Sequence, residues 1–418
     1  MKRMSFFISL ALTLLLTVRT ETILAQTVKV DGEVRTRTEI RDGMKSPVAD
    51  SLNGALVTNM RTRLTLSYAT NVLKSKITLQ DTRTFGQTVP GVSTTGNIGI
   101  YEAWGEYLFA PGMSFTIGRQ ALEYDDKRLL SSSNWSNTGN AHDLLLLKYV
   151  SNDFTLHLGS AWNNASDVMV ESPYSIGYKT MSYVWTTKTI GKVGVSAIWI
   201  NEGFQKGTTA ALLKERTYRN TAGGNIWLKT PDIPINFYGT GYYQFGHDAK
   251  NKELSAYLLA GKVQGRINRA LALTVGEDYY SGSNSTLESN KDNTFNKLYG
   301  ANHCFNGSME YWATPPVQGL SDTYFEIEEN PVANFTFDAT FHKFDLAKLP
   351  KKGNKDLGSE LDVTITYALS PQVSLQGGYS TYFITNAVDI AKNITTNSRT
   401  PQWAFVMISF KPTFLASK

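Results

Sequence analysis

The chain has 418 residues, with 41 Lys and Arg, 36 Asp and Glu, 33 Gly and a single Cys. One cysteine cannot form an internal disulfide, and no paired Cys/His spacing predicts a structural zinc site. No apolar run of about 20 residues follows the N-terminal segment, which excludes a helical membrane protein. The 41% of apolar residues exclude a disordered chain.

The first predicted element is a secretory signal peptide at residues 1–25. Two basic residues precede an apolar stretch at 6–18, and the small residue Ala25 stands before the expected cleavage point. An N-terminal anchor helix is the alternative, although Arg19 and Glu21 interrupt the apolar stretch. Removal of the signal leaves residues 26–418 as one domain with 38 basic and 35 acidic residues. This charge balance predicts no nucleic-acid partner.

Strand periodicity begins directly after the signal. In residues 27–40, β-branched side chains such as Val28 and Val30 alternate with charged ones such as Lys29 and Arg35. Segments of about ten residues with one apolar and one polar face recur along the chain, and they are typical of transmembrane β-barrels. Aromatic residues fall largely within or near the ends of these segments, as in a membrane barrel, although the aromatic core of a soluble β-protein is the alternative.

We therefore predict an all-β fold, a transmembrane antiparallel up-and-down β-barrel of about 18 strands, with 16 strands as the alternative. The predicted strands span residues 27–40, 58–69, 73–84, 99–109, 113–120, 142–150, 153–162, 178–187, 192–201, 217–229, 234–246, 253–264, 269–280, 321–328, 334–344, 358–367, 371–382 and 401–411.

Tight and long connections alternate between these strands, and only the link at 247–252 departs from the alternation. Short periplasmic turns and long extracellular loops of an outer-membrane barrel produce this asymmetry. The tight connections, rich in Pro, Gly, Asn and Asp, are 70–72, 110–112, 151–152, 188–191, 230–233, 265–268, 329–333 and 368–370. The long ones are 41–57, 85–98, 121–141, 163–177, 202–216, 281–320, 345–357 and 383–400.

Several motifs resemble one family. The most distinctive text comprises Glu102-Ala103-Trp104, Gly118-Arg119-Gln120, Tyr124-Asp125-Asp126-Lys127-Arg128, Asn134-Trp135 and His142-Asp143. Shorter pieces follow at 319–322, 341–344, 358–362, 378–380 and 410–412. Together they resemble the alginate export family of outer-membrane barrels. The resemblance implies an 18-stranded barrel with a positively charged lumen that passes or binds a polyanionic sugar. Lys127 departs from the family pattern, in which a neutral amide is typical.

The candidate functional residues are charged side chains on the predicted lumen face. The first three strands contribute a basic stripe, and Arg suits uronate carboxylates because its planar fork can hold both oxygens. The alternative is that these charges pair as structural ion networks. The parity of Arg119 would direct it at lipid unless a bulge or the strand end intervenes. The candidates for the substrate pathway are Arg35, Arg37, Arg61, Arg63, Lys74, Lys76, Glu102, Glu106, Arg119, Arg128, Glu360 and Asp362.

The longest predicted connection, 281–320, can fold inward as a plug or lid or lie outside as an ordinary loop. Within it, His303-Cys304 fits a lone, partly buried cysteine better than a metal or thiol site. We expect no cofactor, no metal and no catalytic residues, because nucleophile elbows, phosphate loops and His-Glu-x-x-His patterns are missing from the sequence.

These features predict a channel in the outer membrane of a Gram-negative bacterium that passes anionic solutes, including alginate-like polyuronates or oligosaccharides. The alternatives are a general or differently selective porin, and a surface protein whose loops bind a partner without transport. The expected partners are outer-membrane lipid, an anionic polysaccharide or small anion, and periplasmic export or uptake proteins, around a monomeric barrel. Export and import both fit these features.

Overall fold

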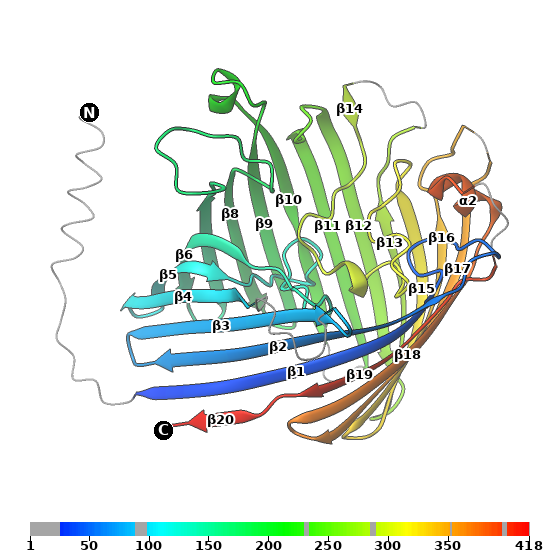
Figure 1. The fold of residues 1–418 in the computed structure, drawn as a ribbon, viewed down its shortest axis with the longest axis horizontal. Coiled ribbons are helices and arrows are strands. Elements are labelled where there is room, and N and C mark those ends of the chain that lie inside the picture. The colour runs from blue at the N-terminus through cyan, green and yellow to red at the C-terminus, as the bar shows by residue number, and fades with distance from the viewer. Residues whose placement is uncertain are drawn as a thin grey trace.

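The structure is a computed structural model that describes residues 26–87, 98–229, 234–284, 290–351, 353–394 and 399–417. These residues form one continuous sheet that curls into a barrel (Figure 1). The predicted signal peptide lies outside the described residues. The strands are β1 (Thr27–Asp42), β2 (Ala55–Ala69), β3 (Leu73–Thr84), β4 (Gly99–Ala110), β5 (Met113–Gln120), β6 (His142–Val150), β7 (Phe154–Trp162), β8 (Thr180–Ile190), β9 (Val193–Gln205), β10 (Arg216–Lys229), β11 (Ile235–His247), β12 (Glu253–Arg266), β13 (Leu271–Tyr280), β14 (Lys291–Asp292), β15 (Leu320–Val332), β16 (Phe335–Asp345), β17 (Asp356–Ser370), β18 (Val373–Phe383), β19 (Gln402–Phe410) and β20 (Thr413–Ala416).

The barrel wall consists of 18 antiparallel strands, β1–β13 and β15–β19, and each pairs with its neighbours along the chain. The pairing of β1 with β19, from Val34 opposite Phe410 to Asp42 opposite Gln402, closes the barrel. The predicted fold class and strand count are therefore confirmed. Closure pairs both edges of the sheet. A sheet inside a bilayer requires this, because lipid cannot satisfy backbone hydrogen bonds.

The last strand is broken and then resumes. Pro412 lacks a backbone N–H and interrupts the ladder after Phe410, but its carbonyl accepts a 2.8 Å hydrogen bond from the Gly32 N–H. Beyond it, β20 pairs with β1 again at Lys29 and Val30. The sequence prediction ended the final strand at residue 411 and missed β20, because the proline hides the continuation.

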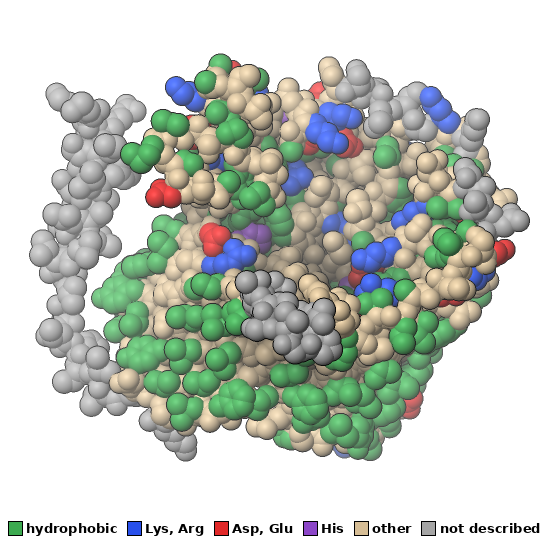
Figure 2. Space-filling view, in the orientation of Figure 1, with side chains coloured by type: hydrophobic (Ala, Val, Ile, Leu, Met, Phe, Trp, Pro, Cys, Tyr) green, Lys and Arg blue, Asp and Glu red, His purple; other side chains and the backbone are tan. Residues whose placement is uncertain are grey.

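The two faces of the wall have opposite chemistry. On β2, Leu64 is 46% exposed on the outer face, whereas Arg61 is 1% exposed inside. Figure 2 shows hydrophobic side chains covering the wall, while charged side chains gather around a hollow among the loops. Stacked aromatic pairs such as Tyr257 and Tyr279, with ring centroids 5.9 Å apart, lie on the outer face near the long-loop end. This outer surface is the lipid-facing band of a membrane barrel.

The connections follow the predicted asymmetry, with some turns shifted by a few residues. The turn placed at 329–333 is Ala333-Asn334, because β15 continues to Val332 through a bulge. The tight connection at 230–233 lies outside the described residues. Among the described residues no helix is long and apolar enough to cross a membrane. The helical elements are η1 (Leu212–Lys214), η2 (Asn302–Cys304) and α2 (Asn386–Lys392).

Two of the long loops fold into the barrel. The described parts of residues 121–141 and 281–319 cross the interior between the strands β1–β3 in front and the wall behind (Figure 1). Leu130 and Phe295, one from each loop, are at most 1% exposed and belong to one apolar cluster with lumen-facing wall residues such as Met181. Of the two arrangements considered for the longer loop, the structure has the inward one.

Candidate functional site

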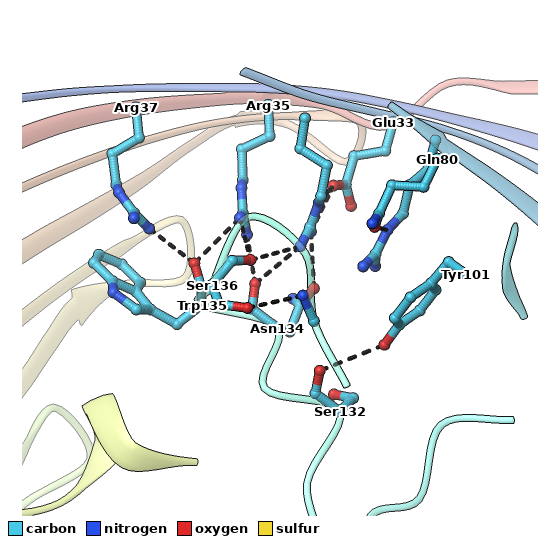
Figure 3. Close-up of polar contacts among 12 residues, drawn as sticks. Glu33, Arg35, Arg37, Gln80, Tyr101, Ser132, Asn134, Trp135 and Ser136 are labelled. Carbon is cyan, nitrogen blue, oxygen red and sulfur yellow. Dashed lines mark hydrogen bonds and ion pairs between the residues drawn. The ribbon is translucent and has the colours of Figure 1, made fainter. Parts of the chain in front are cut away.

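The site is the barrel interior, where the basic stripe meets the inward loop 121–141. Arg35 on β1 stands directly opposite Arg61 on β2, and Arg37 lies one pleat further along β1. Arg35 and Arg37 point toward the loop (Figure 3), and all three arginines are at most 6% exposed. Their inward direction follows from the period of two, because the intervening residues Thr36 and Thr62 face outward.

The three arginines bind backbone carbonyls of the loop. Arg35 donates to Asn134 O at 2.6 Å and to Ser136 O at 2.9 Å. Arg37 donates to Trp135 O at 2.8 Å. Arg61 donates to Asn134 O and to Ser136 O, both at 3.1 Å. A charged donor gives a hydrogen bond worth about 1.5–3 kcal/mol, so residues 134–136 are held firmly against β1 and β2.

Acidic neighbours balance part of this positive charge. Glu33 accepts a 2.6 Å hydrogen bond from Arg61, and Glu39 accepts one of 2.7 Å from Arg37. Trp135 completes the contact: the Arg37 guanidinium lies 4.2 Å from its ring centre, and His303 of the other loop stacks on it at 3.9 Å. We name Arg35, Arg37, Arg61 and the bound residues 134–136 the arginine clamp.

The remaining members of the basic stripe, Arg63, Lys74 and Lys76, lie closer to the tight-turn end of the barrel. Arg63 donates to Gln80 at 2.7 Å and covers the ring of Tyr101 at 3.7 Å. Lys74, the second residue of β3, is exposed to the lumen and has no ion-pair partner in the described part of the chain. Lys76 pairs with Glu102 at 2.5 Å. Arg63 and Lys74 are therefore the members of the stripe that remain accessible to a solute.

Other predicted residues are also used by the protein itself. Glu106 accepts hydrogen bonds from Ser114 at 2.7 Å and Lys148 at 3.2 Å. Arg119 is not in the lumen, so its assignment to the substrate pathway is wrong. It shares the outer face with Ile117, which is 58% exposed, and pairs with Asp143 at 3.0 Å near the loop end of β5. Strand parity, which already directed it outward, decides its position.

Arg128 lies inside the barrel in loop 121–141. Its guanidinium holds both oxygens of Asp278 on β13, at 2.6 and 2.8 Å, and its Nε donates to Asp126 at 2.6 Å. Tyr280 accepts a further 3.0 Å hydrogen bond, and the ring of Phe305 covers the guanidinium at 4.0 Å. With every donor group engaged and 6% of its surface exposed, Arg128 ties the loop to the far wall.

Glu360 and Asp362 on β17 anchor the longer loop. Glu360 accepts the Met309 N–H at 2.7 Å, and Asp362 accepts the Ser308 N–H at 3.0 Å. Gly307 has φ +84° and packs so closely on Glu360 that a Cβ would meet its carboxylate at 2.6 Å, which explains the glycine there. Both predicted acids thus face the lumen, where they act as loop anchors.

The two inward loops also bind each other. Ser131 N donates to Tyr299 O at 3.1 Å, and Tyr299 N donates to Leu129 O at 2.9 Å. Lys297, in the longer loop and outside the strands, is 6% exposed and donates to Asn306 at 2.9 Å. Burial, and to a smaller extent the nearby Arg128 guanidinium, lowers the pKa of the Lys297 ammonium to about 7.

Cys304 is exposed, which corrects the expectation that it is partly buried. It lines a cavity beneath the loops together with Phe305 and residues of β10–β16. No group of three or more His, Cys, Asp or Glu in the described ranges is arranged to hold a metal ion.

Comparison with known proteins shows the family to which this barrel belongs. Residues 27–402 match the family model described as alginate export. The chain belongs to the alginate export family. No curated protein matches it. As a member of the alginate export family, it is a β-barrel of the Gram-negative outer membrane and a channel protein.

Several solved structures are similar in fold to this alginate export family member. OccAB1 of Acinetobacter baumannii superposes with a TM-score of 0.65 at 10% identity, over 95% of this chain and 98% of that chain. OccAB4 of the same organism gives 0.64 at 10% identity, over 95% and 100% of the two chains. Pseudomonas aeruginosa OpdK, solved with vanillate, gives 0.60 at 11% identity, over 93% and 99%. At these identities the likeness shows the fold alone.

Sequence reasoning missed part of this family member's interior. Asn134 and Trp135 were noticed only as a motif, and their role as clamp partners depends on contacts about a hundred residues away, such as Arg35 with Asn134. Asp278 was missed, and Asp322 was noticed only as part of the motif at 319–322. Their inward parity on β13 and β15 was a readable signal, because an acid on the lumen face of a strand needs a partner.

Proposed function

We propose that this channel passes anionic solutes, in particular carboxylate-bearing sugars of the uronate type. The observation that carries the proposal is the position of Arg63 and Lys74, which remain accessible on the lumen wall of β2 and β3 beside the arginine clamp. One cation on each of two neighbouring strands gives a carboxylate consecutive weak sites, which favours passage over trapping.

Two further observations support a preference of the channel for anionic solutes. The arginine clamp contributes fixed positive charge close to this path, because its three arginines face only Glu33 and Glu39 among their ion-pair partners in the described residues. In addition, family membership supports a channel for an anionic sugar, and the structural neighbour OpdK was solved with vanillate, an organic anion.

Blockade of the ion current in planar bilayers tests the proposal. We expect a mannuronate trimer to block the open channel at concentrations about tenfold lower than the neutral trimer maltotriose. The double variant Arg63→Gln with Lys74→Gln should lose most of this difference. Lys250→Gln, an exposed lysine in the short loop after β11, is the matched control and should behave as the wild type.

Equal blockade by both trimers would overturn the proposed anion preference. If blockade by mannuronate is unchanged in the double variant, Arg63 and Lys74 are not the residues that bind the mannuronate. A purified, folded barrel that conducts no current would contradict the channel itself.

A further inference from the structure

A cavity of about 510 Å³ lies inside the barrel, beneath the two inward loops. Its roof contains Arg128 and Phe305 from the loops, and its walls contain Lys262, Tyr324 and Glu326 from β12 and β15. Lys229, the last residue of β10, lies at its lower rim, so the cavity extends toward the tight-turn, periplasmic end. Its volume falls in the range of small-molecule sites, roughly 300–1,000 Å³.

The charges at the roof are already paired with one another. Arg128 is held by Asp278 and Asp126, at 2.6 Å each. Asp322 accepts hydrogen bonds from His342 at 2.9 Å and from Asn306 at 3.3 Å. Each of these groups is therefore already engaged by a partner of opposite or complementary character, so they offer a solute few free hydrogen-bonding atoms.

The charges on the lower walls are free. In the described ranges Glu326 has no hydrogen-bond or ion-pair partner, and Lys262 contacts only the ring of Tyr238, at 5.1 Å. Lys229 likewise has no carboxylate partner among the residues that the structure places. Asp338 reinforces the negative side, because it stands opposite Glu328 in the β15–β16 ladder, next to Glu326. One cavity thus presents uncompensated positive and negative side chains on separate strands.

We propose that this cavity binds a small zwitterion, a solute that carries an ammonium and a carboxylate group, such as an amino acid or an amino-sugar acid. Glu326 receives the ammonium, and Lys262 with Lys229 receives the carboxylate. A solute with a single charge satisfies one side and leaves the other charged side chain desolvated and unpaired, which costs affinity. The rings of Trp227, Tyr238 and Tyr324 give the solute's carbon skeleton apolar contact.

The inference deepens the proposed function and rests on it, because a solute reaches this cavity through the lumen. It adds a second charge requirement to the carboxylate preference. Anions still pass along the wall of β1–β3, whereas a zwitterion is also held on the wall of β10–β16. The free acid Glu326 distinguishes this cavity from a purely anionic path.

Isothermal titration of the detergent-purified barrel tests the inference without requiring conductance. The probes are gluconate, glucosamine and 2-amino-2-deoxygluconate, which share a six-carbon skeleton and carry a negative, a positive and both charges. We expect the zwitterion to bind at least about tenfold more tightly than either of the others. Similar affinity for all three probes, or no binding of the zwitterion, overturns the inference whether or not the barrel conducts.

Two variants assign the charges. Glu326→Gln should lower the affinity for the zwitterion about tenfold, to that for gluconate, and Lys262→Met should lower it to that for glucosamine. Glu329→Gln, an exposed acid on the outer face of β15, is the matched control and should bind as the wild type. Unchanged zwitterion affinity in Glu326→Gln overturns the assignment. If the uronate preference fails in bilayers while these affinities hold, the proposed function fails and the cavity assignment stands.

Discussion

Arg61 lies on β2 with 1% of its surface exposed and joins Glu33 to the carbonyls of Asn134 and Ser136. A lone buried guanidinium would be costly, so the loop backbone and the carboxylate are what make its position stable. For Arg35 the loop backbone supplies these contacts, because both of its Nη atoms donate to loop carbonyls. At the scale of single residues, the three buried arginines of the arginine clamp therefore hold the inward loop in place. The more exposed Arg63 and Lys74 are left to contact the solute.

Replacing Arg61 by alanine tests this division. Removing one partner of a buried ionic contact costs about 3–5 kcal/mol, so loop 121–141 should detach far more often. Hydrogen exchange at residues 134–140 should rise by at least about 100-fold while the strands stay protected. Arg83→Ala is the control and should change exchange there little, because Arg83 pairs with Asp81 and with no other carboxylate in the described residues. Unchanged exchange in Arg61→Ala would contradict the clamp.

Lys297 provides a pH-dependent test. Its pKa is about 7 in the folded barrel and 10.5 when exposed, so between these values the released loop binds more protons than the packed loop. Packing of the loop therefore becomes more favourable as the pH rises from about 7 toward 10, and below about 7 the full cost of burying the charge is present. Lys297→Met should lose this dependence.

The measurement is the cleavage rate of loop 281–319 by a protease between pH 7 and 9.5. The ratio of wild-type to Lys297→Met rates at each pH cancels the pH profile of the protease itself. We expect this ratio to fall as the pH rises. A ratio independent of pH would show that the Lys297 ammonium does not oppose loop packing.

Parity explains which side chains could be predicted from the sequence. A shift of one residue moves a strand side chain to the other face, so the lumen positions of Arg35, Arg61 and Glu360 were readable from alternation alone. Their partners were not, because Arg35 meets Asn134 and Glu360 meets Met309 across separations of 99 and 51 residues. Local periodicity contains no information on how a long loop returns to the wall.

At the scale of elements, the two inward loops behave as one partition. They are joined by the parallel bridge between Leu130 and Tyr299 and by the stack of Trp135 on His303. Loop 121–141 is fixed to β1 and β2 by the arginine clamp, whereas loop 281–319 is fixed to β17 by Glu360 and Asp362. The wall strands β1, β2 and β17, together with β13 through Asp278 and Arg128, therefore hold one connected structure inside the lumen.

The Glu360 anchor can be tested by comparing two variants. Glu360→Gln keeps an oxygen that accepts the Met309 N–H, so the loop should stay in place. Glu360→Ala removes the acceptor and leaves the Met309 N–H without a partner in a buried position, which costs about 1–3 kcal/mol. Single-channel recordings should show larger and more frequent current fluctuations in Glu360→Ala only. Identical recordings from both variants would contradict the anchoring role.

The missed elements share physical causes. β14 has two residues and α2 has seven, which is too short for either periodicity to show. β20 has four residues and follows Pro412, which ends the alternating pattern of β19. By contrast, the 18 wall strands were predictable because each must alternate between lipid and lumen over its whole length.

At the scale of the whole molecule, the lumen is divided by charge. One side, β1–β3, carries the basic stripe, and another side carries acids that are partly paired with histidine, arginine or loop amides. These acids, on β13, β15, β16 and β17, are Asp278, Asp322, Glu326, Glu328, Asp338, Glu360 and Asp362. Because four of these seven acids hold the loops or His342, and because Arg63 and Lys74 have no ion-pair partner in the described residues, we expect the positive side to govern small mobile ions.

The reversal potential of the wild-type channel in a tenfold KCl gradient tests this account most directly. A lumen governed by Arg63, Lys74 and the arginine clamp predicts a potential of the sign that chloride selectivity gives, and this potential should shrink as the salt concentration rises on both sides because screening weakens the fixed charges. A potential of the opposite sign, set by potassium, would contradict the account.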